Sequence, residues 1–200
     1  ENYLYIDKTE LAGHLAERGR YYFLSRPRSF GKSLFIDTLS SLFRGEQALF
    51  KGLAIEPQWD WQRVCPVLKL SLGSGDFSTQ AGIEKQLIRL LKRQQKELNI
   101  ICEEAEDIVS CFSDLIVQAH KKYQQKVVIL IDEYDKPILD NITNKEMALV
   151  ARNLLKSFYS VIKEHDHYIP ALENIIVSKE TLDTFDIEKI DLVALLWQTG

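Results

Sequence analysis

The chain has 200 residues, of which 46% are hydrophobic and 27% are charged, fractions that are ordinary for a globular protein with a sizeable core. Its formal net charge of −4 argues against an overall basic field that would recruit nucleic acid. Length alone fits either one large domain or two small ones.

Three cysteines without a CxxC pair predict neither a disulfide framework nor a zinc site, and they favour a reducing, cytoplasmic location. The sequence contains no stretch of about 18 consecutive apolar residues, so no membrane span is predicted. The segment Glu1–Asp7 lacks the basic start and apolar run of a signal peptide. Since it also lacks an initiator methionine, we expect the chain to begin inside a longer protein.

The first half of the chain predicts two helices and two strands. Asp7 is expected to cap a helix that ends at Gly19, with Glu10 completing a capping box. The aromatic and aliphatic run Arg20–Ser25 is typical of a strand. The next apolar residues have helical spacing up to Gly45, and a second strand is predicted at Val64–Leu72.

The second half predicts amphipathic helices at Ser78–Leu98, Glu103–Tyr123 and Asn144–Glu164. Between the last two, Val127–Ile131 is five consecutive aliphatic residues without alternation. Such a run indicates a strand buried on both faces, as in the middle of a parallel sheet. Strands separated by helices predict an α/β fold with a mainly parallel sheet.

The segment between the first predicted strand and the following helix has the chemistry of a phosphate-binding loop. Gly31 allows the backbone to approach phosphates, and the N–H groups at the start of the helix point at them. Lys32 is expected to contact the β and γ phosphates, and the Ser33 hydroxyl to ligate magnesium. Arg26 occupies the position where the general phosphate-loop pattern has glycine.

Two carboxylates, Asp132 and Glu133, directly follow the predicted buried strand. Ligands of open α/β sheets bind at the carboxyl ends of strands. Asp132 is expected to hold magnesium, directly or through water, and Glu133 to act as the general base toward the attacking water. The expected catalytic residues are therefore Glu133, Lys32 and Asp132, and the expected metal ligands are Ser33 and Asp132.

At these motifs the sequence resembles the AAA-ATPase-like family of prokaryotic P-loop proteins, which often carry a PD-(D/E)XK-type nuclease domain further along. The matching stretches are YIDKTEL (Tyr5–Leu11), YYFLSRPRSFGKSLF (Tyr21–Phe35), LFKGLAI (Leu49–Ile55), LIDEYDKPILD (Leu130–Asp140) and LKSFYSVIK (Leu155–Lys163). The RPRxFGKS form of the loop is particular to the family, so Arg26 is a family trait, while Ser29 stands where a second arginine is expected.

The resemblance implies a three-layer P-loop NTPase fold of the RecA/AAA type, followed by a short helical linker segment. It also implies that the YID segment lies against the adenine. The residues expected to bind ATP are thus Tyr5, Ile6, Asp7, Arg26, Pro27, Arg28, Ser29, Phe30, Gly31, Lys32, Ser33 and Leu34.

Residues 1–165 are interpreted as the P-loop ATPase core, and residues 166–200 as a fragment of a downstream lid or linker region. Between Asp132 and Gly200 there is too little strand-forming sequence to complete the sheet of such a core. The family's sensor motif and helical lid are also missing after the last predicted helix. We therefore expect that a long stretch is absent, with a seam between Lys163 and Pro170.

The sequence favours a magnesium-dependent ATPase that binds ATP and ADP and controls an attached or partner effector such as a nuclease. A non-hydrolysing nucleotide-binding module and a small-molecule kinase are the alternatives. A homo-oligomer would let Arg26 or Arg28 act as an arginine finger toward a neighbouring subunit. DNA is a further expected partner, through a fused nuclease that this chain lacks. The residues Lys85, Arg89, Lys92, Arg93 and Lys96 form a basic stripe, which is interpreted as a solvated face, with contact to DNA phosphates as the alternative.

Overall fold

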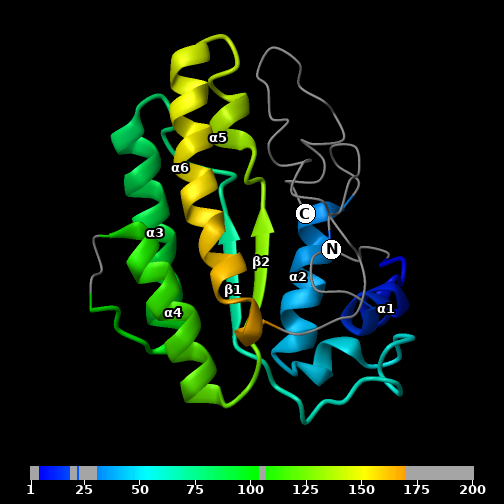
Figure 1. The fold of residues 1–200 in the computed structure, drawn as a ribbon. Coiled ribbons are helices and arrows are strands. Elements are labelled where there is room, and N and C mark those ends of the chain that lie inside the picture. Colours follow the sequence, from blue (N-terminus) through cyan, green and yellow to red (C-terminus); the bar gives the residue numbers. More distant parts are fainter. Residues whose placement is uncertain (1–4, 19–21, 23–30, 104–106, 170–200) are drawn as a thin grey trace.

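Two parallel strands form the sheet of the described residues, and helices lie on both of its faces (Figure 1). The computed structural model describes residues 5–18, 22, 31–103 and 107–169. The elements, in chain order, are α1 (Thr9–Arg18), α2 (Lys32–Phe43), the 3-10 helix η1 (Gln47–Phe50), β1 (Val67–Ser71), α3 (Gln80–Leu98), α4 (Ile108–Tyr123), β2 (Val128–Asp132), α5 (Lys136–Leu139), α6 (Lys145–Glu164) and the 3-10 helix η2 (Asp166–Tyr168).

Local capping determines where the three long helices begin. Each starts directly after a residue whose side chain accepts the N–H three positions further on: Thr79 for α3, Asp107 for α4 and Asn144 for α6. Such a bond satisfies one of the amide donors that a helix leaves unpaired at its start. The predicted starts at Ser78 and Glu103 were therefore too early, while the helix predicted from Asn144 is confirmed.

The main hydrophobic core lies on the sheet face that α3, α4 and α6 cover. Leu68 and Leu70 of β1 belong to it, with Phe112 and Phe158 of the helices stacked at a ring distance of 4.5 Å. Side chains alternate along a strand, so Val67 of β1 faces the opposite way, into a small cluster with Val128 and Leu130 of β2. Helix α2 lies on this second face (Figure 1).

Strand β2 is less buried than its uninterrupted aliphatic sequence predicted. Val128 is buried, but Ile129, Leu130, Ile131 and Asp132 are half-buried. The expectation of full burial on both faces was wrong, because Ile129 and Ile131 pack against the main core and Leu130 against the small cluster, but each side chain stays partly exposed. The parallel α/β class is confirmed, whereas the three-layer P-loop arrangement stays a prediction. Apart from Tyr22, the strand predicted at Arg20–Ser25 lies outside the described residues.

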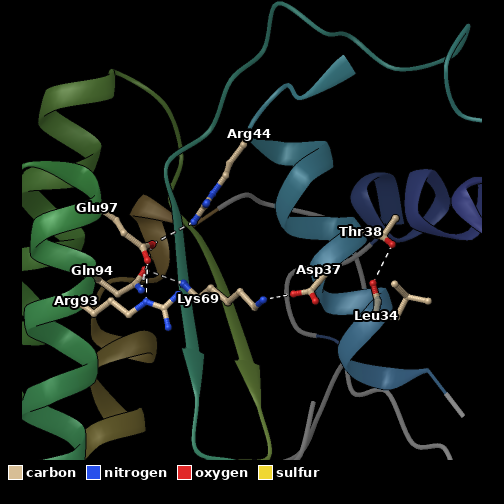
Figure 2. A network of polar contacts seen from close by, with 8 residues as sticks. All are labelled: Leu34, Asp37, Thr38, Arg44, Lys69, Arg93, Gln94 and Glu97. Atoms are coloured by element: carbon tan, nitrogen blue, oxygen red, sulfur yellow. Dashed lines mark hydrogen bonds and ion pairs between the residues drawn. The ribbon is translucent and has the colours of Figure 1, made fainter. Parts of the chain in front are cut away.

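The edge of β1 away from β2 is closed by a helix side chain. Gln94 of α3 is buried, and its Oε1 accepts the backbone N–H of Lys69 at 3.0 Å. The Lys69 side chain forms an ion pair with Asp37 of α2 (Figure 2). A strand edge left with free N–H groups can pair with another chain, so the Gln94 bond protects this edge of β1. The Gln94 bond and the Lys69–Asp37 ion pair together hold β1 between α3 and α2.

A second, smaller core joins α1, α2 and η1. Its buried members are Ala12, Phe35, Leu42, Phe50 and Ile55, and the rings of Trp59 and Trp61 pack against them. Both tryptophans thus cover apolar side chains.

The segment after α6 is continuous with the core. The carbonyl of Tyr168 accepts the N–H of Val127 at 2.9 Å, and Ile169 is buried. Residues up to Ile169 therefore pack with the rest of the described residues. Residues 170–200 lie outside the described residues, so the predicted linker and the predicted missing stretch stay predictions. No helix of the described residues is both long and apolar enough to cross a membrane.

Candidate nucleotide-binding site

Helix α2 begins at the residue where the phosphate-loop pattern requires a helix to begin. Gly31 precedes it with φ 77° and ψ 25°, a left-handed conformation that glycine adopts at little cost. A Cβ at Gly31 would meet no described atom within 4 Å, and the left-handed backbone by itself favours glycine there. The first helical bond runs from the N–H of Phe35 to the Gly31 carbonyl at 2.9 Å, leaving the amides of residues 32–34 without acceptors in the helix.

The first turn of α2 is anchored on one side and open on the other. Phe35 is buried in the smaller core, whereas Ser33 is exposed, Leu34 is 56% exposed and Lys32 is half-buried. No acidic residue stands in this turn. The amides and the lysine together give the helix start a positive potential, which suits an anion.

The start of α2 lies at the carboxyl ends of the strands (Figure 1). At the other end of the helix, the carbonyl of Phe43 accepts the N–H of Cys65, two residues before β1, at 2.8 Å. From this level, α2 and the segment Cys65–Leu72 extend toward the same end of the sheet. Followed from its end to its start, α2 covers about 18 Å, and Cys65–Leu72 covers about 23 Å. Lys32 and Ser33 are thereby brought to the level of the last residues of β1 and β2.

Asp132 occupies the last position of β2, where it is the register partner of Ser71 in β1. Alternation along the strand places Asp132 on the same face as Leu130, the face that α2 covers. Its carbonyl accepts the N–H of Leu72 at 3.0 Å, so the hydrogen bonds between the two strands continue one residue past the end of β1. The structure therefore puts a half-buried carboxylate on the face and at the end where the phosphate-loop helix starts.

Glu133 follows in a conformation that is unusual for its residue type. Its φ is 52°, in the left-handed region that residues other than glycine seldom adopt, and its side chain is exposed. The next residue, Tyr134, is buried and packs edge-on against Tyr159 at a ring distance of 5.6 Å. Strained backbone conformations persist where the surroundings hold them and cluster at functional sites.

Two buried amide side chains hold the loop that follows β1 beside Glu133. Nε2 of Gln86 donates to the carbonyl of Ser74 at 2.6 Å. Nδ2 of Asn141 donates to the carbonyls of Phe77 and Pro137 at 2.7 and 2.8 Å, which ties the loop to α5. This loop therefore has a fixed position at the edge of the candidate site.

The carboxylate of Asp7 is used to join the start of α1 to a distant loop. It accepts the N–H of Ala54 at 2.7 Å, the N–H of Thr9 at 2.9 Å and the Thr9 hydroxyl at 2.7 Å. The Ala54 bond, followed by the Thr9 bonds, lowers the pKa of Asp7 below its usual value of 3.8. Tyr5 and Ile6 are 41% and 69% exposed. The predicted adenine contact therefore rests on these two side chains and remains a prediction.

The other predicted loop residues, Arg26, Pro27, Arg28, Ser29 and Phe30, lie outside the described residues. Within the described ranges, no group of three or more His, Cys, Asp or Glu residues could hold a metal ion. Magnesium commonly takes one or two protein ligands and completes its shell with water and phosphate oxygens. A hydroxyl from Ser33 and a carboxylate from Asp132 fit that donor set.

Sequence reasoning missed the residues that shape the site from the β1 side: Gly73, Gln86 and Asn141. One signal was available, since Gly73 and Gly75 stand with a single residue between them directly after a strand. Glycines at such places often mark a close approach of another group. Neither amide carried a local signal for its bond to this loop, because Ser74 lies 12 residues from Gln86 and Phe77 lies 64 residues from Asn141.

A family model with the description "Predicted AAA-ATPase" matches residues 1–183. The chain belongs to this family. It is also 47% identical over 169 residues to a protein of Azotobacter chroococcum mcd 1, described as an uncharacterized protein in the vnfD 5′ region. No solved structure matches the chain.

The match to the Azotobacter protein covers 84% of this chain but only 33% of the relative. The chain therefore spans about a third of the length of that relative. Membership of the AAA-ATPase-like family supports nucleotide binding as the general property of this domain. The finer assignments, to hydrolysis, magnesium and an effector, are proposals.

Proposed function

We propose that this chain binds magnesium-ATP between the start of α2 and the end of β2, and that it hydrolyses the ATP. The observation that carries the proposal is the position of the α2 start relative to the end of β2. A glycine-initiated, positively polarised helix start and a pair of carboxylates lie at the same end of one parallel sheet. That combination matches what triphosphate and magnesium require of a protein.

The residues take the following roles in this proposal. The amides of residues 32–34 and the Lys32 ammonium bind the phosphate oxygens, and the Ser33 hydroxyl and the Asp132 carboxylate bind magnesium. Magnesium supplies charge neutralisation at the phosphates when it is bound. Glu133 orients the attacking water and accepts its proton. Its exposure is consistent with access to that water.

Two alternatives differ in what they demand of Glu133. A non-hydrolysing module would bind ATP with the same α2 residues but would not need a base. A small-molecule kinase would need an acceptor site in place of a water. The left-handed backbone of Glu133 places an exposed acid directly after Asp132, which supports a role for it as the base.

The experiment that tests the proposal is release of inorganic phosphate from ATP by the purified protein, with magnesium and with EDTA. Magnesium-dependent release that Lys32→Ala removes is the expected result. Tight ATP binding without phosphate release would favour the non-hydrolysing module. Transfer of phosphate to an added metabolite in preference to water would favour the kinase.

We further propose that ATP turnover controls an effector in the remainder of a longer protein or in a partner, with a nuclease acting on DNA as the first candidate. The basic stripe of α3 is exposed along its length, as contact with phosphates would require. One member, Arg93, bonds Glu97 at 2.8 Å.

A homo-oligomer belongs to the same proposal, since it would allow an arginine to act between subunits. The three free thiols fit a reducing cytoplasm.

A further inference from the structure

The carboxylate of Glu133 occupies the space into which any side chain on Gly73 would project. A Cβ built on Gly73 lies 2.7 Å from Oε2 of Glu133 and 3.2 Å from its Cδ. Contacts under 3.0 Å are essentially never seen for a real Cβ, so the two cannot coexist in this arrangement. Gly73 is also outside the left-handed region, so glycine is not required there by its backbone conformation.

The backbones on both sides of this contact are held in place. Leu72 donates its N–H to the carbonyl of Asp132 at 3.0 Å, immediately before Gly73 and Glu133. On the far side, Gln86 fixes the carbonyl of Ser74 at 2.6 Å. Buried Tyr134 holds the chain directly after Glu133. A side chain at position 73 would therefore be accommodated by rotation of the exposed Glu133 side chain and not by movement of either segment.

We propose that Gly73 is a positioning residue for Glu133, because only a residue without a side chain leaves room for the carboxylate in this position. This inference rests on the proposed function, in which Glu133 is the base for the attacking water. A base must be within hydrogen-bond reach of the proton that it accepts. A misplacement of about 1 Å can cost on the order of 100-fold in rate. Gly73 thus acts on the water step through Glu133 and touches neither nucleotide nor metal.

The test compares Gly73→Ala, Glu133→Gln and the double variant, with Ser74→Ala as the control in the same exposed loop. Gly73→Ala is expected to lower kcat by roughly 10- to 100-fold. Its KM for ATP, its magnesium dependence and its melting temperature should stay at parental values. Ser74→Ala should behave as the parent. In the double variant, Gly73→Ala should add no further loss to that of Glu133→Gln, because both changes remove the same contribution.

The outcomes separate this inference from the function on which it rests. Parental kcat in Gly73→Ala, beside a slow Glu133→Gln, would overturn the positioning role and leave the ATPase proposal intact. Equal fractional losses on both backgrounds would also overturn it, because Gly73 would then act independently of Glu133. Parental kcat in Glu133→Gln would reject the catalytic assignment itself, and the positioning role with it.

Discussion

Asp132 of β2 and Ser71 of β1 are partners at the last position of the parallel register, on the sheet face that α2 covers. Counted from the Cys65–Phe43 bond at about 3.3 Å for each strand position, this pairing brings Asp132 to the level of the α2 start. The magnesium role proposed for Asp132 follows from that placement.

Asp132→Asn should weaken magnesium binding at the site more than it changes the stability of the fold. A carboxamide keeps the shape of the side chain but lacks the charge that attracts a hard divalent cation. The magnesium concentration for half-maximal ATP turnover should rise by about 10-fold or more. Asp37→Asn is the matched control, since Asp37 lies further along α2 and pairs with Lys69. A parental magnesium curve in Asp132→Asn would remove this residue from the metal site.

Magnesium-ATP should stabilise the parent and fail to stabilise Lys32→Ala. At about 100 times its dissociation constant, a ligand that binds only the folded state contributes roughly 2.7 kcal/mol. For a chain of this length that corresponds to a rise in melting temperature on the order of 5–10 °C. Thermal unfolding with and without magnesium-ATP measures it. An equal rise in both proteins would show that ATP does not use the start of α2.

Gly31→Ala and Gly52→Ala form a matched pair that separates strain from function. Their φ values are 77° and 78°, and a Cβ at either position meets no described atom within 4 Å. Each substitution should cost about 1 kcal/mol in unfolding free energy, because alanine is disfavoured in the left-handed region. Only Gly31→Ala should also raise the dissociation constant for ATP, measured by titration calorimetry. Equal ATP affinity in the two variants would count against a phosphate-binding role for Gly31.

Asp7 should contribute stability that is lost in acid. Its pKa is lowered in the folded state, mainly by the Ala54 N–H and then by Thr9. A carboxyl with a lowered folded pKa stabilises the fold above its unfolded value, here 3.8, and the contribution disappears as pH falls through the folded value. Parent and Asp7→Asn should therefore differ in urea unfolding at pH 7, and the difference should shrink as the pH falls below 3.8. A difference that is constant with pH would assign the effect to packing.

Local chemistry made the start of the candidate site predictable from the sequence. Gly31 and Lys32 stand at a helix start, and Asp132 ends a strand, because each place depends on a short pattern of apolar and turn residues. The bonds that shape the site depend on pairs far apart in the chain. The Gly73–Glu133 contact requires the register of β1 and β2, and the Asp7–Ala54 bond requires the packing of α1 on a loop. No periodicity encodes such pairs.

The burial of β2 also could not be predicted from the sequence of the strand alone. Ile129, Leu130 and Ile131 form the aliphatic run that predicted complete burial, and all three are half-buried. Hydrophobicity along one strand records what that strand can pack against. It does not show how completely other elements cover each face of that strand, which is a property of the whole fold.

The most direct test of the proposed function is the rate of phosphate release by Glu133→Gln and by the parent, at saturating magnesium-ATP. The glutamine keeps the size of the side chain and cannot accept the proton of the attacking water. Turnover should fall by roughly 10²- to 10⁴-fold, while the stabilisation by magnesium-ATP is retained. Turnover at the parental rate would contradict the assignment of Glu133 as the catalytic base.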